Sequence, residues 1–194
     1  MANTVDRSTP QYAVVGNIIE GARLPAVADA DVSDGVQALF DAFQRSRGNV
    51  PNLFRIAAHR PAIVETLYAH MQAVMGPGDV STLLKELVAC RVSQINGCEY
   101  CLASHSKLVK RMGGTDAQVA ALATGDYSGF EPAWSAALTY GAEIAQVGGR
   151  VSDETFFRVA EHWNPPQIVE LTTAATLFSY FNRFANALRI PITK

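Results

Sequence analysis

Apolar residues recur along most of the chain at helical spacing, and glycines, prolines and small polar residues mark where each apolar segment stops. A first helix is predicted to open at a capping box formed by Asp34 and Gln37 and to end near Gly48. Pro51 suits the first turn of a short second helix, and Pro61 opens a third. The start and stop signals are therefore those of a helical protein.

The third helix carries an apolar stripe in which residues are three or four positions apart: Ile63, Leu67, Met71 and Val74. Further helices are predicted at about residues 80–95, 98–113, 115–125, 132–147 and 152–163, and a long last helix opens at Asn164-Pro165 and ends before Pro191. The only segment with strand character, Tyr12 to Ile19, is short. We therefore predict an all-α protein, with residues 1–32 as a partly irregular N-terminal arm and residues 33–194 as a single helical domain.

Composition narrows the functional class. The 194 residues carry a net charge of −2 and no cluster of lysines and arginines, which argues against a nucleic-acid partner. No segment approaches the roughly 18 uninterrupted apolar residues that a membrane span needs, and the polar start of the chain does not resemble a secretory signal. A cytoplasmic location is expected. In a reducing compartment, a Cys-x-x-Cys pair is typical of catalytic or metal-binding sites rather than of a disulfide scaffold.

The central motif places Cys98 and Cys101 one helical turn apart, with His105 one turn further on. Cys98 is expected at the start of a helix, where unpaired N–H groups favour an anion. Cys101 and His105 share a helix face, so the imidazole can take or share a thiol proton. A pair at this spacing can close a disulfide, and it can resolve the sulfenic acid that a peroxide forms on one thiolate. Reversible dithiol chemistry is the leading hypothesis.

Glu86 is the carboxylate that belongs with this motif. It shares a face of the preceding helix with Cys90 and Ser93, so it reaches the cysteines if that face packs against their helix. A carboxylate there can hold His105 in one tautomer or carry a proton onward. Cys90 lies among apolar residues, which favours a small core residue, although a third thiol beside Glu86 stays open.

Eleven residues separate Glu86 from Cys98, two separate Cys98 from Cys101, and three separate Cys101 from His105. This pattern resembles the signature of AhpD-like alkylhydroperoxidases, a branch of the carboxymuconolactone decarboxylase superfamily. The flanking segments GNVPNLFRIAAHRP and FNRFANALRIP also resemble those of peroxidase-related members, and the resemblance covers roughly residues 35–192. It implies an AhpD-like all-helical fold, a homo-oligomer (a trimer, or a hexamer built from trimers) and peroxide reduction without a metal, haem or flavin. The decarboxylases of this superfamily do not depend on a cysteine pair, so that activity is not expected.

The resemblance also implies roles for the motif residues. Cys101 matches the position attacked by peroxide and Cys98 the resolving position, while Glu86 and His105 match a proton relay. The helix-dipole argument alone favours Cys98 as the thiolate, so the assignment of Cys101 depends on the resemblance. Tyr100 stands where the best-studied form has a histidine, and with a pKa near ~10 it is a poor proton carrier at neutral pH. Tyr100 and Cys90 remain candidate lining residues of the site.

We therefore predict a thiol-dependent peroxidase that takes hydrogen peroxide or an organic hydroperoxide and is regenerated by a protein or lipoyl-type dithiol. The first alternative is a redox adaptor that passes electrons from a dithiol donor to a separate peroxidase. The second is a metal-stabilised structural protein, because Cys and His are good zinc ligands, although the motif supplies only three local ones. Asn182 and Arg183, in the last helix, are expected at a subunit interface or cap, and the aromatic residues around them in the core or at an oligomer contact.

Overall fold

The computed structural model describes residues 19–193, and within these residues every regular element is a helix. After a short 3-10 turn, Asp29–Asp31, the helices follow in chain order: α1 Asp34–Arg47, α2 Asn52–Ala57, α3 Pro61–Met75, α4 Thr82–Ile95, α5 Glu99–Arg111, α6 Asp116–Thr124, α7 Pro132–Ala145, α8 Asp153–Ala160 and α9 Pro165–Leu188. The all-α prediction is confirmed. The segment with strand character falls almost wholly outside the described residues.

The predicted helix ends are mostly those observed, because each is set by local chemistry. Thr115 and Asn164 both form capping boxes with the residue three positions later, as the sequence indicates. Gly48 ends α1 in the left-handed conformation, at φ 78°, where a side chain would be strained. The start of α1 is a correction: Ser33, not Asp34, is its N-cap and accepts the N–H of Val36.

The stripe predicted on α3 is wrong at its first position. Met71 and Val74 are buried and Leu67 packs against the core, as predicted, but Ile63 is 48% exposed and its neighbour Val64 is fully buried. The buried face of α3 is therefore rotated by one residue at its N-terminal end. Its position depends on where α1 and α9 lie, and a sequence pattern spanning two turns does not specify that.

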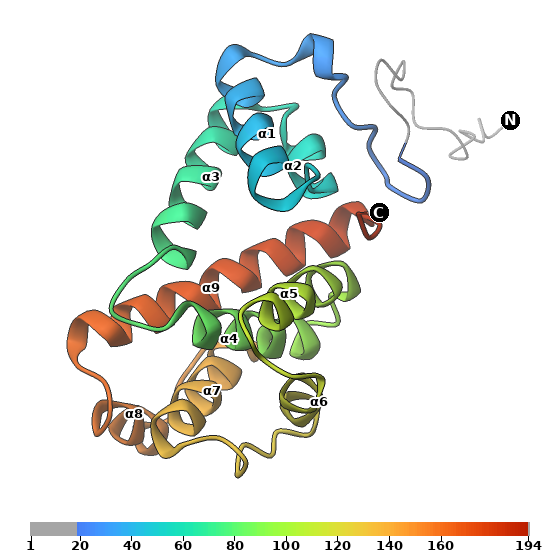
Figure 1. Cartoon of the computed structure of the whole chain (residues 1–194). Coiled ribbons are helices and arrows are strands. Elements are labelled where there is room, and N and C mark those ends of the chain that lie inside the picture. Colours follow the sequence, from blue (N-terminus) through green and yellow to red (C-terminus); the bar gives the residue numbers. More distant parts are fainter. Residues whose placement is uncertain (1–18, 194) are drawn as a thin grey trace, which may run out of the picture.

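The helices form two layers on either side of the long α9 (Figure 1). The helices α1, α2 and α3 lie on one side of it, and α4 to α8 lie on the other. Helix α4 packs against α5, α7 and α9 and is buried along most of its length, including Lys85 and Glu86. Gly141 lets α7 approach α4 closely, since a Cβ there would lie 3.0 Å from Val88 Cγ1.

Ahead of α1, residues 19–32 run along the layer of α1 to α3, and the 3-10 turn Asp29–Asp31 is their one regular element. Ala26 is buried there, and backbone N–H groups of Arg23 and Val27 donate to Leu188 and Arg55. These backbone hydrogen bonds hold the segment against α2 and the end of α9. None of the helices in residues 19–193 is both long and apolar enough to cross a bilayer.

Candidate active site

Cys98 is the N-cap of α5, and its Sγ accepts the backbone N–H of Cys101 at 3.4 Å. The chain reaches this position through Gly97, whose φ of 61° belongs to the left-handed region, and Cys98 N–H donates to the carbonyl of Ser93. A sulfur in the cap position accepts a hydrogen bond from a backbone N–H group that the first turn of the helix would otherwise leave unpaired. The expected placement of Cys98 at a helix start is confirmed.

The two sulfurs differ in acidity. Cys98 and Cys101 are both free thiols and are 1% and 3% exposed. The pKa of Cys98 is lowered to about 7, chiefly because the Cys101 thiol donates to it, against the raising effect of burial. The same hydrogen bond, together with burial and the charge on Cys98, raises the pKa of Cys101 well above its ordinary value. One negative charge on the pair therefore resides on Cys98, with Cys101 as the thiol that solvates it.

Asn182 is a site residue that the sequence analysis placed at an interface or cap instead. It is fully buried on α9, and its Nδ2 donates to Ser93 Oγ at 3.0 Å while its Oδ1 accepts from Asn96 Nδ2 at 3.1 Å. Its amide also lowers the pKa of both thiols. The signal in the sequence was a single amide among the aromatic residues of the last helix.

Glu86 and His105 form a buried pair between α4 and α5. Glu86 Oε2 lies 2.5 Å from His105 Nδ1, and both side chains are largely shielded from water. An ionised carboxylate only accepts hydrogen bonds, so Nδ1 carries the proton and donates it. The His105 ring also meets the edge of Phe178, with ring centroids 4.4 Å apart. The expected packing of the Glu86 face against the cysteine helix is therefore observed.

A narrow cavity of about 30 Å³ leads to this group. Cys101 and His105 line it together with Tyr100, Ser104 and Arg47, and its remaining wall is apolar: Pro51, Leu53, Phe54, Met71, Phe178 and Phe181. Cys98 is not among the lining residues. A second cavity of about 230 Å³ reaches Glu86 and His105 from the side of α1 and α3. Within residues 19–193, Cys101 is thus the thiol that a ligand in the narrow cavity would meet.

Tyr100 both contacts α2 and lines the narrow cavity. Its hydroxyl accepts the backbone N–H of Leu53 at 3.2 Å, which joins the start of α5 to the start of α2. Burial raises the pKa of Tyr100 to about 12, so the phenol stays protonated at neutral pH. It also lines the narrow cavity beside Cys101. The residue therefore shapes the cavity wall, and its chemistry differs from that of a histidine at the same place.

Cys90 has the surroundings of a core residue. It is fully buried, its Sγ lies 3.9 Å from Ser106 Oγ, and burial raises its pKa to about 12. A thiol with that pKa is protonated and unreactive at neutral pH. Among residues 19–193, no three or more His, Cys, Asp or Glu side chains are gathered as metal ligands would be.

The geometry can be set beside known proteins. The sequence profile of the carboxymuconolactone decarboxylase family matches residues 61–143, which include the whole motif. The uncharacterised protein YdfG of Bacillus subtilis is 30% identical over 120 residues, a match that covers 61% of this chain and 82% of YdfG. The chain belongs to the carboxymuconolactone decarboxylase family.

Solved structures share the fold of this chain. A peroxidase-related protein from Ralstonia eutropha JMP134, described as an alkylhydroperoxidase AhpD core, superposes with a TM-score of 0.82 at 21% identity, over 91% of this chain and 95% of that one. The debrominase Bmp8 superposes with a TM-score of 0.76 at 19% identity, over 87% and 90% of the two chains. A cysteine-to-alanine variant of Bmp8 is known in complex with 2,3,4-tribromopyrrole. At these identities the likeness establishes the AhpD-like fold.

Proposed function

We propose that this protein is a thiol-dependent peroxidase of the alkylhydroperoxidase type, with Cys101 as the sulfur that meets the peroxide. The observation that carries the proposal is the narrow cavity, where Cys101 and a carboxylate-paired His105 line the same wall. Behind Cys101, and outside that wall, Cys98 supplies a partner sulfur whose pKa is lowered to about 7. Cys101 as nucleophile and His105 as proton donor thus line one small cavity, and Cys98 lies behind Cys101 as the resolving thiol.

In the first step, Cys101 Sγ attacks the terminal peroxide oxygen and the O–O bond breaks. The thiol proton of Cys101 passes to the Cys98 thiolate, to which it is already hydrogen-bonded. The departing alkoxide takes a proton from His105 as imidazolium, whose charge is paired with Glu86 Oε2 at 2.5 Å. The products are an alcohol, a Cys101 sulfenic acid, a Cys98 thiol and a neutral imidazole.

In the second step, Cys98 Sγ attacks the sulfenic sulfur and the S–O bond breaks. The hydroxide that leaves takes the Cys98 proton, so that a disulfide and one water molecule form. The two cysteines have together lost two electrons and the peroxide has gained them. A dithiol of protein or lipoyl type then reduces the disulfide by exchange and becomes a disulfide itself.

The test locates the first oxidised sulfur. Reduced protein is mixed with one equivalent of hydrogen peroxide or a small alkyl hydroperoxide, quenched with a thiol-blocking reagent and examined by mass spectrometry. Cys98→Ser should stop at a sulfenic acid on Cys101, whereas Cys101→Ser should not react beyond the rate of a free thiol. Cys90→Ser is the matched control and should behave as the wild type does. A sulfenic acid on Cys98 in the Cys101→Ser variant would reverse the assignment.

Turnover separates the peroxidase from the redox adaptor. Purified protein with dihydrolipoamide should consume peroxide catalytically. If consumption requires an added second peroxidase, the same cysteines serve the adaptor function. Metal analysis of protein purified without chelator addresses the remaining alternative, since near-stoichiometric zinc bound to these thiols would contradict a dithiol enzyme.

A further inference from the structure

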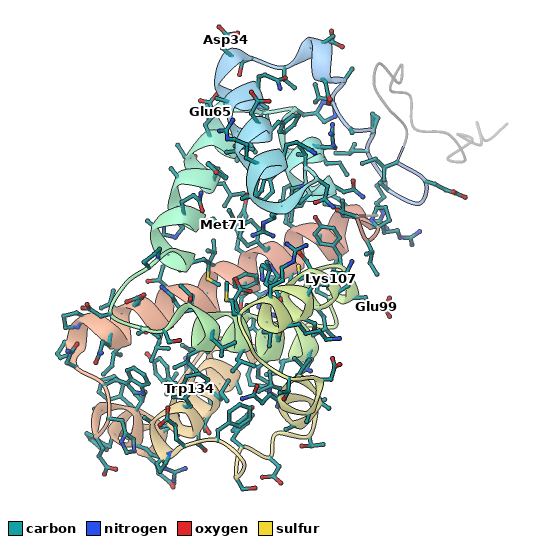
Figure 2. All side chains as sticks on the ribbon, in the orientation of Figure 1. Asp34, Glu65, Met71, Glu99, Lys107 and Trp134 are labelled. Carbon is teal, nitrogen blue, oxygen red and sulfur yellow. The ribbon has the colours of Figure 1, made fainter. Side chains whose placement is uncertain are left out.

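A third cavity, of about 100 Å³, adjoins the narrow one and is lined by more charged residues. The two cavities share four wall residues: Arg47, Pro51, Tyr100 and Ser104. The outer cavity adds two more cations, Lys107 and Arg111. We call this outer cavity the basic vestibule. Figure 2 labels Lys107 on α5 and Met71 on α3. Lys107 lines the basic vestibule, and Met71 lines the narrow cavity.

The fold places the three cations there from two helices. Tyr100, Ser104, Lys107 and Arg111 recur at helical spacing, so they form one face of α5 that runs outward from the cysteines. Arg47 comes from the last turn of α1 and lies between the two cavities. The face of α5 that begins at the dithiol therefore ends in positive charge.

The charges of the vestibule are not balanced by its walls. No Asp or Glu is among the residues described as lining it. Among the described residues, ion pairs hold Lys110 to Asp116 on the other side of α5, and none holds Arg47, Lys107 or Arg111. The Arg47 guanidinium is half-buried and lies over the Phe43 ring, 5.5 Å from its centroid.

The charges around Arg47 also favour an anion in the vestibule. The pKa of Arg47 is lowered, chiefly by burial, with a smaller contribution from the positive charge of Arg111 and against the raising effect of Glu86. Glu86 is already paired with His105. An anion in the vestibule would relieve the repulsion between the two guanidinium groups and offset the desolvation of Arg47. A planar carboxylate suits such a pair of arginines, because each guanidinium offers donors in a fork.

We propose that the basic vestibule binds the carboxylate of an organic hydroperoxide, with its peroxide group in the narrow cavity beside Cys101. This inference rests on the proposed function and names its substrate class: hydroperoxides that bear a carboxylate a few atoms from the O–O group. In this arrangement the alkyl portion lies between the two ends, against Pro51 and Tyr100, which line both cavities.

The test compares a tertiary alkyl hydroperoxide that bears a carboxylate with its methyl ester, which differs mainly in charge. The measured quantity is the ratio of the two second-order rate constants for oxidation of the dithiol, at low ionic strength. The wild type should favour the acid. Arg111→Gln and Lys107→Gln should each lower the ratio by about two- to fivefold, the effect expected for one exposed charge. Lys110→Gln, on the same helix but outside the vestibule, is the matched control and should keep the wild-type ratio.

Reversal of charge gives a readout that a folding defect does not produce. Arg111→Glu should lower the ratio further and should speed oxidation by a hydroperoxide that bears an ammonium group. A wild-type ratio of one, or a ratio that the vestibule variants leave unchanged, would overturn the inference.

Failure of the proposed function gives a different result. In that case neither the ester nor hydrogen peroxide oxidises the pair, and the vestibule is tested by calorimetric binding of the redox-inert hydroxy acid, the alcohol product of the reaction. Binding that Arg111→Gln weakens and Lys110→Gln does not would still support the carboxylate site. Absent binding, or equal competition by inorganic phosphate, would refute it.

Discussion

At the scale of single residues, Cys98 and Cys101 divide the requirements of peroxide chemistry between them. Cys101 lines the narrow cavity, and Cys98 holds the negative charge. In a pair that shares one proton, the charge can move to the accessible sulfur when a peroxide arrives. The sulfur that lines the cavity therefore need not be the sulfur with the lower pKa.

The lowered pKa of Cys98 predicts the pH dependence of the pair. An ordinary thiol has a pKa near ~8.5, whereas that of Cys98 is lowered to about 7. The thiolate fraction should fall as the pH drops through about 7, and the oxidation rate should fall with it. The ultraviolet absorbance of the thiolate and the rate with hydrogen peroxide should show the same midpoint. A midpoint at the ordinary value would contradict the hydrogen bonding described for Cys98.

Asn182 provides the contrast for that measurement. Asn182→Ala removes an amide that stabilises both thiolates, so the midpoint should rise by about one pH unit. Asn186→Ala is the control, because Asn186 also hydrogen-bonds the loop at Asn96 but is exposed. An equal shift in both variants would indicate that the loop, not the amide, sets the acidity.

The motif residues were predictable because they are close in sequence. The spacing of Cys98, Cys101 and His105 on one helix fixes their relative placement, and Glu86 lies on the preceding helix. Asn182 and Arg47 come from distant helices, and only the packing of α9 and α1 brings them to the site. No local pattern encodes such encounters, so these two residues could not be joined to the dithiol before the packing of the helices was known.

At the scale of elements, α4 is held in place by an unusual buried charge. Lys85 is fully buried, donates to the carbonyl of Gly76 at 2.6 Å and pairs with Glu170 on α9. Glu170 also accepts the backbone N–H groups of Asp79 and Val80. This arrangement ties the ends of α3, α4 and α9 together.

Removal of that charge should destabilise the fold without changing the dithiol. Lys85→Met leaves the Glu170 carboxylate without its cation, and we expect the free energy of unfolding to fall by about 3 kcal/mol in urea titrations. Arg158→Ala, which breaks the exposed pair with Glu154, is the matched control and should cost less than about 0.5 kcal/mol. The thiol midpoint should be the same in all three proteins. A Lys85→Met protein as stable as the wild type would show that packing alone fixes these helices.

The boundaries of the helices followed from the sequence more reliably than their orientation. Caps such as Thr115 and Asn164 act within four residues, so they can be read locally. Which face of α3 is buried depends on its neighbours, and there Ile63 was placed wrongly. The same reasoning explains Lys85 and Glu86, whose burial in α4 could not be inferred from their charge.

At the scale of the whole molecule, we propose that the chain forms a homo-oligomer, a trimer or a hexamer. Apolar side chains lie exposed where α9 passes the end of α7: Tyr180 is 45% and Val147 is 99% exposed. A groove of about 690 Å³ lies there, lined by Ile144, Gly148, Thr176, Tyr180, Arg183 and Phe184 among others. Exposed apolar surface of this kind is typical of subunit contacts.

Oligomerisation can be tested through this surface. Light scattering on the wild type should give three or six times the chain mass, and Tyr180→Asp should give smaller species, because a charge would be buried at the contact. Phe157→Asp is the control, since Phe157 is 66% exposed but lies on α8. A monomeric wild type, or dissociation by the control alone, would contradict this placement of the contact.

The position of Cys98 as the cap of α5 links helix stability to redox state. A thiolate is a strong acceptor for the Cys101 N–H, whereas a disulfide sulfur is a weak one, so closing the disulfide leaves the first turn of α5 less well capped. Interactions that favour the thiolate favour the reduced protein, and they shift the reduction potential upward. A less negative potential would make the disulfide easy for a donor to reopen, so the helix end itself would help to return the protein to its working form after every cycle.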